Sequence, residues 1–362
     1  MRRVYTSELV PGMITAEDIY HYNSNQLILP KGLVLTDQAI TRLDDYSIIS
    51  IRIEDDEVSI PASSTGADYG GETYFKQIRS SQEFKKFKQK FQSEVSEFKD
   101  HFNDVVRKNA PIDVDGLMEK SLALINETHS SVDLLDMIHN MRDFDDSTYV
   151  HSLNVGLLCH LFAKWLHMSD EEANLAMMCG LLHDIGKLMI PDAILKKPGR
   201  LTPEEYEQVK EHPTNGYIVF LHQNIDIHIK NSALMHHERC DGSGYPMQLK
   251  GEQIDPYAKM VAIADVYDAM TSARVYRGPM CPFKVISVFE EEGIQRYDPK
   301  YILVFLEHIV NTYIGNTVRL SDGRTGKIIY INKDFLSRPT VQVGDKFVDL
   351  AKEKNLTIEA IL

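Results

Sequence analysis

Adjacent histidine and aspartate side chains are the most unusual feature of this sequence, because together these residue types hold divalent transition metals. His183 and Asp184 stand at the end of the apolar run Leu175 to Leu182. Burying such a pair is costly unless it meets a strong partner, and a cation is such a partner. His236 and His237 repeat the pattern. Imidazoles and carboxylates in this setting predict a site for Fe, Mn, Zn or Co and argue against a thiolate site.

Three more residues extend the candidate set. His151 and Asp265 lie in stretches with helical patterning, and His212 precedes Pro213, a position that marks a break between two helices. A lone buried histidine more often belongs to the core, where one hydrogen bond satisfies it. We keep that interpretation for His129, His139, His160, His167, His222, His228 and His308.

A loop of turn-forming residues follows the second histidine pair. After Glu238 the chain runs through Gly242, Gly244 and Pro246, which let a backbone approach a ligand closely. Three stretches together resemble the HD-GYP family, the cyclic di-GMP phosphodiesterase branch of the HD hydrolase superfamily. They read HDIGK from residue 183, HHE from residue 236 and DGSGYP from residue 241. The resemblance covers about residues 145–310 and implies an all-α catalytic domain with two or three metal ions, commonly iron or manganese.

The resemblance also implies a role for each matching position. Asp184, bridging two ions, and Lys187, placed to meet a phosphate oxygen, would be the catalytic residues. The implied metal ligands are His151, His183, Asp184, His212, His236, His237 and Asp265. The implied substrate contacts are Asp145, Lys187, Gly244, Tyr245, Pro246, Asp268, Arg274 and Arg277. For the two arginines, the alternative is an exposed pair on a loop.

The implied activity is hydrolysis of cyclic di-GMP to linear pGpG by a metal-activated hydroxide, which lowers the level of this second messenger in bacterial signalling. GMP would follow if the opened dinucleotide binds again. One alternative is a phosphodiesterase for another cyclic dinucleotide such as cyclic GMP-AMP, with the same metal core. A second is a cyclic di-GMP receptor without turnover, which the complete set of ligand positions argues against. A nucleotidase for mononucleotides would leave the Gly-Tyr-Pro loop unexplained.

The number of metal ions can be predicted from one position. Family members that hold three ions tend to carry a glutamate four residues before the first histidine ligand, where this sequence has Ser147. A neutral hydroxyl is a poor ligand for a divalent cation beside harder carboxylates. We therefore expect two divalent ions, Fe or Mn first, with Zn, Co, Ni and Mg as alternatives.

The surrounding elements predict a multidomain chain, in which an all-α HD-type catalytic domain is flanked by a small α+β domain and a small β-rich domain. Capping signals at Ser169 and Thr202 mark helix starts, and a glycine-containing turn near Gly323 predicts a hairpin. In the first domain, Leu27 to Leu29 predicts a strand and Thr36 the start of a helix. The expected division is 1–60 (α+β), 61–73 (linker), 74–111 (long amphipathic helix), 112–312 (HD-GYP phosphodiesterase domain) and 313–362 (β-rich).

The long helix carries an apolar stripe at steps of three and four from Phe84 to Val105. We expect this stripe to pack on the next domain of the same chain. The alternative is a homodimer formed through the 84–105 helix, and the flanking domains could bind a protein partner.

Composition excludes several classes of partner. The chain has 362 residues, 25% of them charged, and a formal net charge of −14, which argues against binding a nucleic-acid polymer. Its four cysteines form no CxxC pair, which fits a reducing cytoplasm. No apolar stretch follows the basic start as in a signal peptide, and no run approaches the about 20 apolar residues of a membrane span. We therefore expect a cytoplasmic protein that does not bind membranes and has cyclic di-GMP as its ligand.

Overall fold

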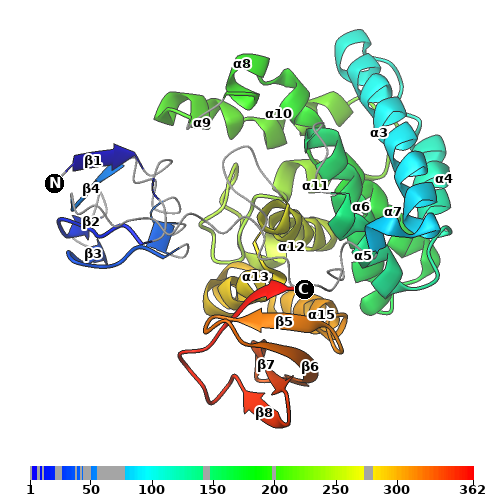
Figure 1. Ribbon diagram of the computed structural model, residues 1–362. Coiled ribbons are helices and arrows are strands. Elements are labelled where there is room, and N and C mark those ends of the chain that lie inside the picture. Colours follow the sequence, from blue (N-terminus) through cyan, green and yellow to red (C-terminus); the bar gives the residue numbers. More distant parts are fainter. Residues whose placement is uncertain are drawn as a thin grey trace. The chain divides into compact units, whose positions relative to one another are not determined.

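The computed structural model divides into two compact units, Met1–Gly71 and Glu72–Leu362 (Figure 1). The finer predicted division of the chain stays a prediction. The structure describes residues 2–5, 9, 12–20, 27–36, 39–40, 43, 50–54, 78–141, 147–197, 201–272 and 280–362.

The first unit contains two small antiparallel sheets around an apolar cluster that includes Leu35 and Leu43. The predicted strand at Leu27 to Leu29 is confirmed. The Thr36 hydroxyl accepts a hydrogen bond from the amide of Ala39 at 3.2 Å, so this predicted helix start is confirmed as well. The paired strands are β1 (Arg2–Tyr5) with β4 (Ser50–Ile53), and β2 (Ile19–Tyr20) with β3 (Leu27–Leu29).

The second unit is helical up to residue 311. Capping boxes at Ser169 and Thr202 are present, as the sequence predicts. The first helices are α3 (Gln82–Lys108), α4 (Val114–Ile125), α5 (Ser131–Asn140), α6 (Ser147–Trp165), α7 (Asp170–Leu182), the 3-10 helix Ile185–Met189, α8 (Asp192–Leu195) and α9 (Pro203–Val209). They are followed by α10 (His212–Phe220), α11 (Ile227–Met235), the 3-10 helix Gly251–Gln253, α12 (Pro256–Thr271), α13 (Pro282–Val288), the π-helix Phe289–Gly293, α14 (Ile294–Arg296) and α15 (Pro299–Asn311).

Helices α6, α7 and α12 form the centre of this unit (Figure 1). A Cβ atom added to Gly180 of α7 would lie 2.8 Å from the carbonyl oxygen of Val155 in α6 and 2.9 Å from Cα of Gly156. The two backbones therefore touch at this crossing, which fixes the separation of the side chains that project from both helices.

The apolar stripe of α3 is buried within its own chain, with Phe87 and Phe91 fully enclosed in the helical core. The packing interpretation is thus confirmed, and the stripe is not exposed for a homodimer seam. The helix starts at Gln82, because the Ser81 side chain caps it, and stops before Asn109, which adopts a left-handed conformation at φ 52°.

The chain ends in a five-stranded antiparallel sheet of order β8-β7-β6-β5-β9. The predicted hairpin around Gly323 is confirmed as the β5–β6 pair. Apolar side chains of the sheet, such as Val318 and Val341, join the same core as the helices, beside α13 and α15 (Figure 1). Among the helices in the described ranges, none is both long and apolar enough to cross a membrane. The strands are β5 (Thr317–Leu320), β6 (Thr325–Asn332), β7 (Phe335–Val343), β8 (Lys346–Asp349) and β9 (Ile358–Ile361).

Candidate metal centre

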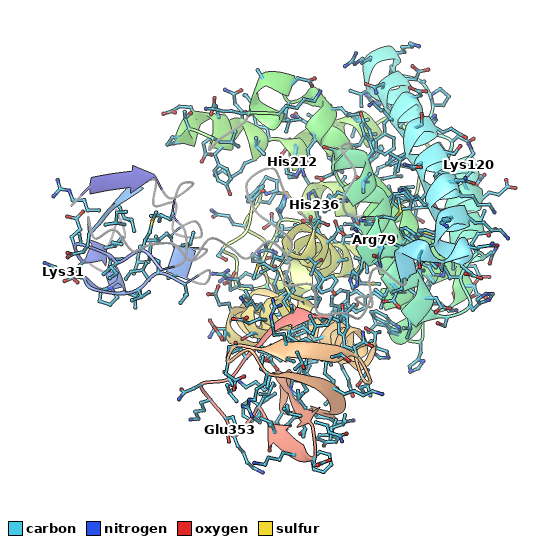
Figure 2. The ribbon with its side chains drawn as sticks, viewed as in Figure 1. Lys31, Arg79, Lys120, His212, His236 and Glu353 are labelled. Atoms are coloured by element: carbon cyan, nitrogen blue, oxygen red, sulfur yellow. The ribbon has the colours of Figure 1, made fainter. Side chains whose placement is uncertain are left out.

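The seven residues expected to be metal ligands converge on one place in the helical unit, where Figure 2 labels two of them. They form three overlapping groups, and within each group the nitrogen and oxygen atoms that could bind an ion lie within 4.8 Å of one another. They come from α6 (His151), the end of α7 (His183, Asp184), the start of α10 (His212), the end of α11 (His236, His237) and α12 (Asp265).

Asp184 lies at the middle of these residues, with each of its carboxylate oxygens facing a different pair of histidines. Its Oδ2 atom is 3.3 Å from Nε2 of His183 and 3.8 Å from Nε2 of His151. Its Oδ1 atom is 3.3 Å from Nε2 of His212 and 3.7 Å from Nε2 of His236. One carboxylate is thus shared by two separate clusters of donor atoms.

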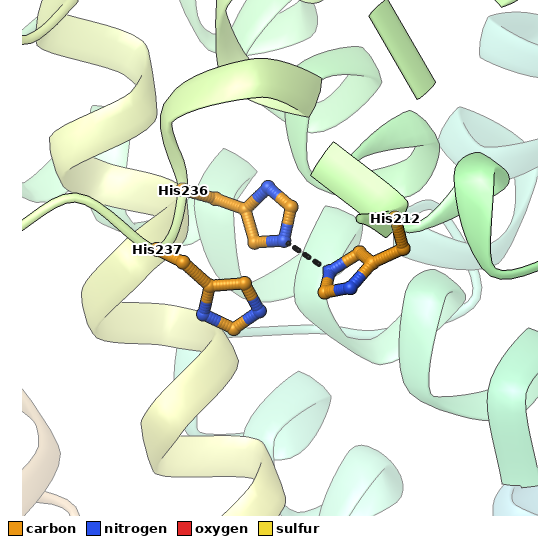
Figure 3. A group of neighbouring side chains, drawn as sticks. All are labelled: His212, His236 and His237. Carbon is orange, nitrogen blue, oxygen red and sulfur yellow. Dashed lines mark hydrogen bonds between the residues drawn. The ribbon is translucent and has the colours of Figure 1, made fainter. Parts of the chain in front are cut away.

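The two clusters differ in composition. The carboxylate half consists of His151, His183 and Asp265, whose Oδ1 atom is 3.0 Å from Nε2 of His151 and 4.0 Å from Nε2 of His183. The imidazole half consists of His212, His236 and His237, and in it Nε2 of His212 lies 3.1 Å from Nε2 of His236 (Figure 3).

Four of these histidines are oriented by a hydrogen bond from Nδ1. An acceptor at Nδ1 fixes the tautomer, because the proton must sit on that nitrogen and leave a lone pair on Nε2. In each case the Nε2 atom is the one that faces Asp184. The pairs are His183 with the Gly180 carbonyl (2.6 Å), His212 with the Val209 carbonyl (2.6 Å), His236 with the Ser232 carbonyl (3.0 Å) and His151 with the Asp268 carboxylate (2.8 Å).

These atoms fit a bound cation. Among the described residues, Nε2 of His183 and Oδ1 of Asp184 are buried without any hydrogen-bond partner. The facing Nε2 atoms of His212 and His236 both carry lone pairs, because their Nδ1 atoms donate to carbonyl groups, so they repel one another unless a cation lies between them. Nitrogen and carboxylate donors of this kind suit a first-row divalent metal.

The protonation states also fit metal binding. Burial acts to raise the pKa of Asp184, but the charges of His183 and Lys187 hold it well below its ordinary value. Burial lowers the pKa of His212 to about 4 and that of His236 far below its ordinary value, so both imidazoles are neutral donors at pH 7. Burial also acts to lower the pKa of His151, but hydrogen bonds with Asp265 and Asp268 raise it to about 9, so this imidazole would release its Nε2 proton when an ion binds.

Known proteins share this part of the chain. Residues 126–301 match the family described as HD domain, so this segment of the chain is an HD domain. A cyclic di-GMP phosphodiesterase of Pseudomonas aeruginosa is 37% identical over 226 residues, which cover 61% of this chain and 54% of that protein. One of Thermotoga maritima is 39% identical over 178 residues, covering 49% of this chain and 48% of that protein.

A solved structure supports the same fold. An HDG"Y"P protein from Bdellovibrio bacteriovorus superposes with a TM-score of 0.50 at 18% identity and covers 85% of this chain and 99% of that one. The likeness to HD-GYP proteins that the sequence indicates is therefore confirmed. The chain spans about half the length of the curated relatives it matches.

Two glycines let the HD domain bring His212 against Asp184. A Cβ atom on Gly186, just after Asp184, would lie 2.0 Å from the carbonyl oxygen of His212 and 2.4 Å from the amide nitrogen of Gly216. A side chain at Gly186 would push the start of α10 away and move His212 with it. Sequence reasoning recorded this glycine as part of a motif and missed its packing role.

The Gly-Tyr-Pro loop lies against the imidazole half of the HD domain. The Tyr245 ring stacks on His237 with centroids 4.7 Å apart and an interplanar angle of 24°. Glu238 is buried and accepts hydrogen bonds from the amides of Met247 (2.6 Å) and Leu249 (2.9 Å), which hold the loop in place. Sequence reasoning assigned Glu238 no role of its own, because its burial, which requires hydrogen-bond partners, is visible only in the structure.

Lys187 lies beside the carboxylate that it was expected to assist. Its ammonium group pairs with Oδ2 of Asp184, a contact at one turn along the 3-10 helix. Contact with a phosphate oxygen therefore requires this ammonium group to share or exchange its partner.

Asp268, one of the expected substrate contacts, lies buried beside His151, and its contact with substrate stays a prediction. Its side chain is 1% exposed, and its carboxylate accepts hydrogen bonds from Nδ1 of His151 and, at 3.2 Å, from the amide of Asn154. It lies one turn after Asp265 on α12, so both carboxylates face His151. Three other predicted substrate contacts, Asp145, Arg274 and Arg277, lie outside the described residues, as does the side chain of Ser147.

Proposed function

We propose that this protein is a metal-dependent phosphodiesterase that hydrolyses cyclic di-GMP to linear pGpG. The observation that carries the proposal is the Asp184 carboxylate, which presents one oxygen to each of two histidine clusters. Relatives that are 36–39% identical and named cyclic di-GMP phosphodiesterases support the choice of substrate.

The carboxylate half and Oδ2 of Asp184 would hold one divalent ion, and the imidazole half and Oδ1 the other. Such a pair of ions lowers the pKa of a shared water and offsets the charge that develops on the phosphoryl oxygens. Asp268 keeps Nδ1 of His151 protonated, so that Nε2 stays available as a donor. Fe and Mn suit this mixed set of donors, and Ser147 in place of a glutamate favours two ions rather than three.

Lys187 supplies a positive charge next to the reacting phosphate. Its ammonium group pairs with Asp184 in the structure, and it would turn to a non-bridging phosphate oxygen in the complex. Gly244, Tyr245 and Pro246 would form a wall of the substrate site. Asp145, Arg274 and Arg277 remain candidates for contacts to phosphate or guanine.

A second candidate substrate is the mixed dinucleotide 3′3′-cGAMP. Relatives from Vibrio cholerae named 3′3′-cGAMP-specific phosphodiesterases are 41%, 31% and 33% identical to parts of this chain. Both substrates carry the same phosphodiester, so the metal core would be shared and only groups facing the bases could discriminate.

Product analysis tests the proposal. The protein is stripped with a chelator, reloaded with Fe(II) or Mn(II), and incubated separately with cyclic di-GMP and 3′3′-cGAMP. We expect pGpG from cyclic di-GMP with reloaded protein and no product with stripped protein or with a reloaded Asp184→Asn variant. A reloaded wild type that leaves cyclic di-GMP intact would overturn the proposal, and cleavage of 3′3′-cGAMP alone would replace its substrate.

A further inference from the structure

A lysine and a tyrosine just before His212 continue the wall of the metal centre toward the surface. Nζ of Lys210 lies 5.9 Å from the ring centroid of Tyr245 and 5.5 Å from that of Tyr206. Tyr245 in turn stacks on His237. Outward from the imidazole half, the His237 ring is therefore followed by the Tyr245 ring, the Lys210 ammonium group and the Tyr206 ring.

Tyr206 is a large side chain that is only partly covered by the protein. It lies on the short helix α9, which is wholly described and has no fully buried residue. Tyr206 itself is 47% exposed. The start of α9 is already fixed by its capping box and by Pro203. The exposed part of the ring can therefore stack on a planar ligand beside the Lys210 ammonium group.

Lys210 can exchange its partner at little cost. Its ammonium group lies 2.6 Å from a carboxylate oxygen of Glu207, and the exposed fractions of the two side chains are 28% for Lys210 and 67% for Glu207. Ion pairs this exposed contribute little to stability, because water solvates both groups nearly as well. A phosphate that brings its own negative charge can therefore take the place of Glu207.

A cyclic dinucleotide has two phosphates and two purine bases, of which the metal centre accommodates one reacting phosphate. The second phosphate needs a cation in a protein whose formal net charge is −14. The bases need flat apolar surfaces, and a tyrosine ring stacks with any base, because every base has a π face.

We propose that Tyr206 and Lys210 form an outer subsite of the metal centre, in which Tyr206 stacks on a purine base and Lys210 pairs with the non-reacting phosphate. This subsite rests on the proposed function and names how the same site holds its substrate. Because stacking tolerates either purine, the subsite contributes affinity for cyclic di-GMP and 3′3′-cGAMP alike and does not select between them.

The test is a comparison of KM and kcat for cyclic di-GMP among full-length, Mn-loaded variants. Tyr206→Ala and Lys210→Met should each raise KM about tenfold, the lower range for loss of one stacked base or one charged contact, with kcat within about twofold and metal content unchanged. Tyr206→Phe keeps a stacking ring and Lys210→Arg keeps a charge, so both should stay close to the wild-type KM.

Lys196→Met is the matched control, because Lys196 also pairs with an exposed acid, Asp192, on the neighbouring helix α8. If KM rose equally in this control, the loss of one positive charge anywhere nearby would explain the effect, and the subsite would be overturned. Wild-type KM values in Tyr206→Ala and Lys210→Met, with an active wild type, would overturn the subsite and leave the proposed function standing. A fully metal-loaded wild type that cleaves no cyclic dinucleotide would overturn both.

Discussion

Two buried carboxylates in the helical unit have pKa values that are shifted in opposite directions. Burial raises the pKa of Glu94 on α3 to about 7, because its partners, a hydrogen bond from Ser121 (2.7 Å) and the nearby charge of Lys120, offset only part of the effect. Asp184 is buried even more completely, yet the neighbouring His183 and Lys187 side chains hold its pKa well below the ordinary value. A carboxylate that stays charged at neutral pH while fully buried indicates a site for a cation.

The largest difference between the two carboxylates should appear when Asp184 is removed together with its neighbour His183. The double variant His183→Ala, Asp184→Ala loses a ligand from each half, so bound metal and turnover should both be abolished. Its melting temperature should also fall below that of the metal-loaded wild type, because bound metal favours the folded state. Metal analysis, turnover and thermal unfolding measure this. Glu94→Gln is the control, with full metal content and turnover expected, and persisting turnover in the double variant would disprove the role of the pair.

A milder change moves one half of the centre away from Asp184. Gly186→Ala forces the start of α10 outward, because its Cβ would meet backbone atoms of His212 and Gly216. Overpacking of this kind typically costs about 1–3 kcal/mol, and it should weaken the ion in the imidazole half more than the other. Metal titration should give one tight ion and one weakened ion per chain. Gly251→Ala is the control, since its Cβ meets no described atom within 4 Å, and an unaltered titration for Gly186→Ala would contradict the packing role.

Asp268 offers a sharper test of the carboxylate half. Asp268→Asn removes the negative charge that supports His151, so metal affinity should fall about 10–100-fold, as for other hydrogen-bond partners of ligands. KM for cyclic di-GMP at saturating metal should not change, because the carboxylate is buried away from the surface. A raised KM with unaltered metal affinity would instead support the substrate contact expected from the sequence.

A further test concerns Glu94, the carboxylate whose pKa is raised. The folded-state pKa of Glu94, about 7, exceeds its ordinary value of 4.5, so the folded protein binds this proton more tightly than the unfolded chain does. The resulting stability is fully present below pH 4.5 and is lost as pH rises through about 7. Wild type should lose about 2–3 kcal/mol more than Glu94→Gln between pH 5 and pH 8. Urea unfolding of both metal-free proteins measures it, and parallel pH dependences would contradict the shift.

The sequence indicates the candidate ligands far better than it indicates what orients them. His183, Asp184 and the neighbouring motif residues are recognisable because they are adjacent in the chain and chemically unusual there. The partner of His151, Asp268, lies 117 positions away, and no local pattern indicates which way its carboxylate turns on α12. The same limit hid the contact between Gly186 and α10, because it depends on how two segments cross.

The helical spacing of apolar residues predicted the buried stripe of α3, but it did not predict that Glu94 is buried on the same face. Phe87 and Phe91 follow the helical spacing, and burying them needs no partner beyond other apolar groups. Glu94 falls on the same buried face, 7% exposed, and reads in the sequence as one more surface charge. Its burial depends on Ser121 of α4, which only the packed structure brings within reach.

Anomalous diffraction from crystals loaded with excess Mn(II) tests the central claim most directly. The sharing of Asp184 predicts two strong peaks about 3.5–4 Å apart, one beside the carboxylate half and one beside the imidazole half, with the carboxylate between them. A third well-occupied peak beside Ser147 and His151 would contradict the two-ion count. A single peak, or two peaks that do not flank Asp184, would contradict the proposed centre itself.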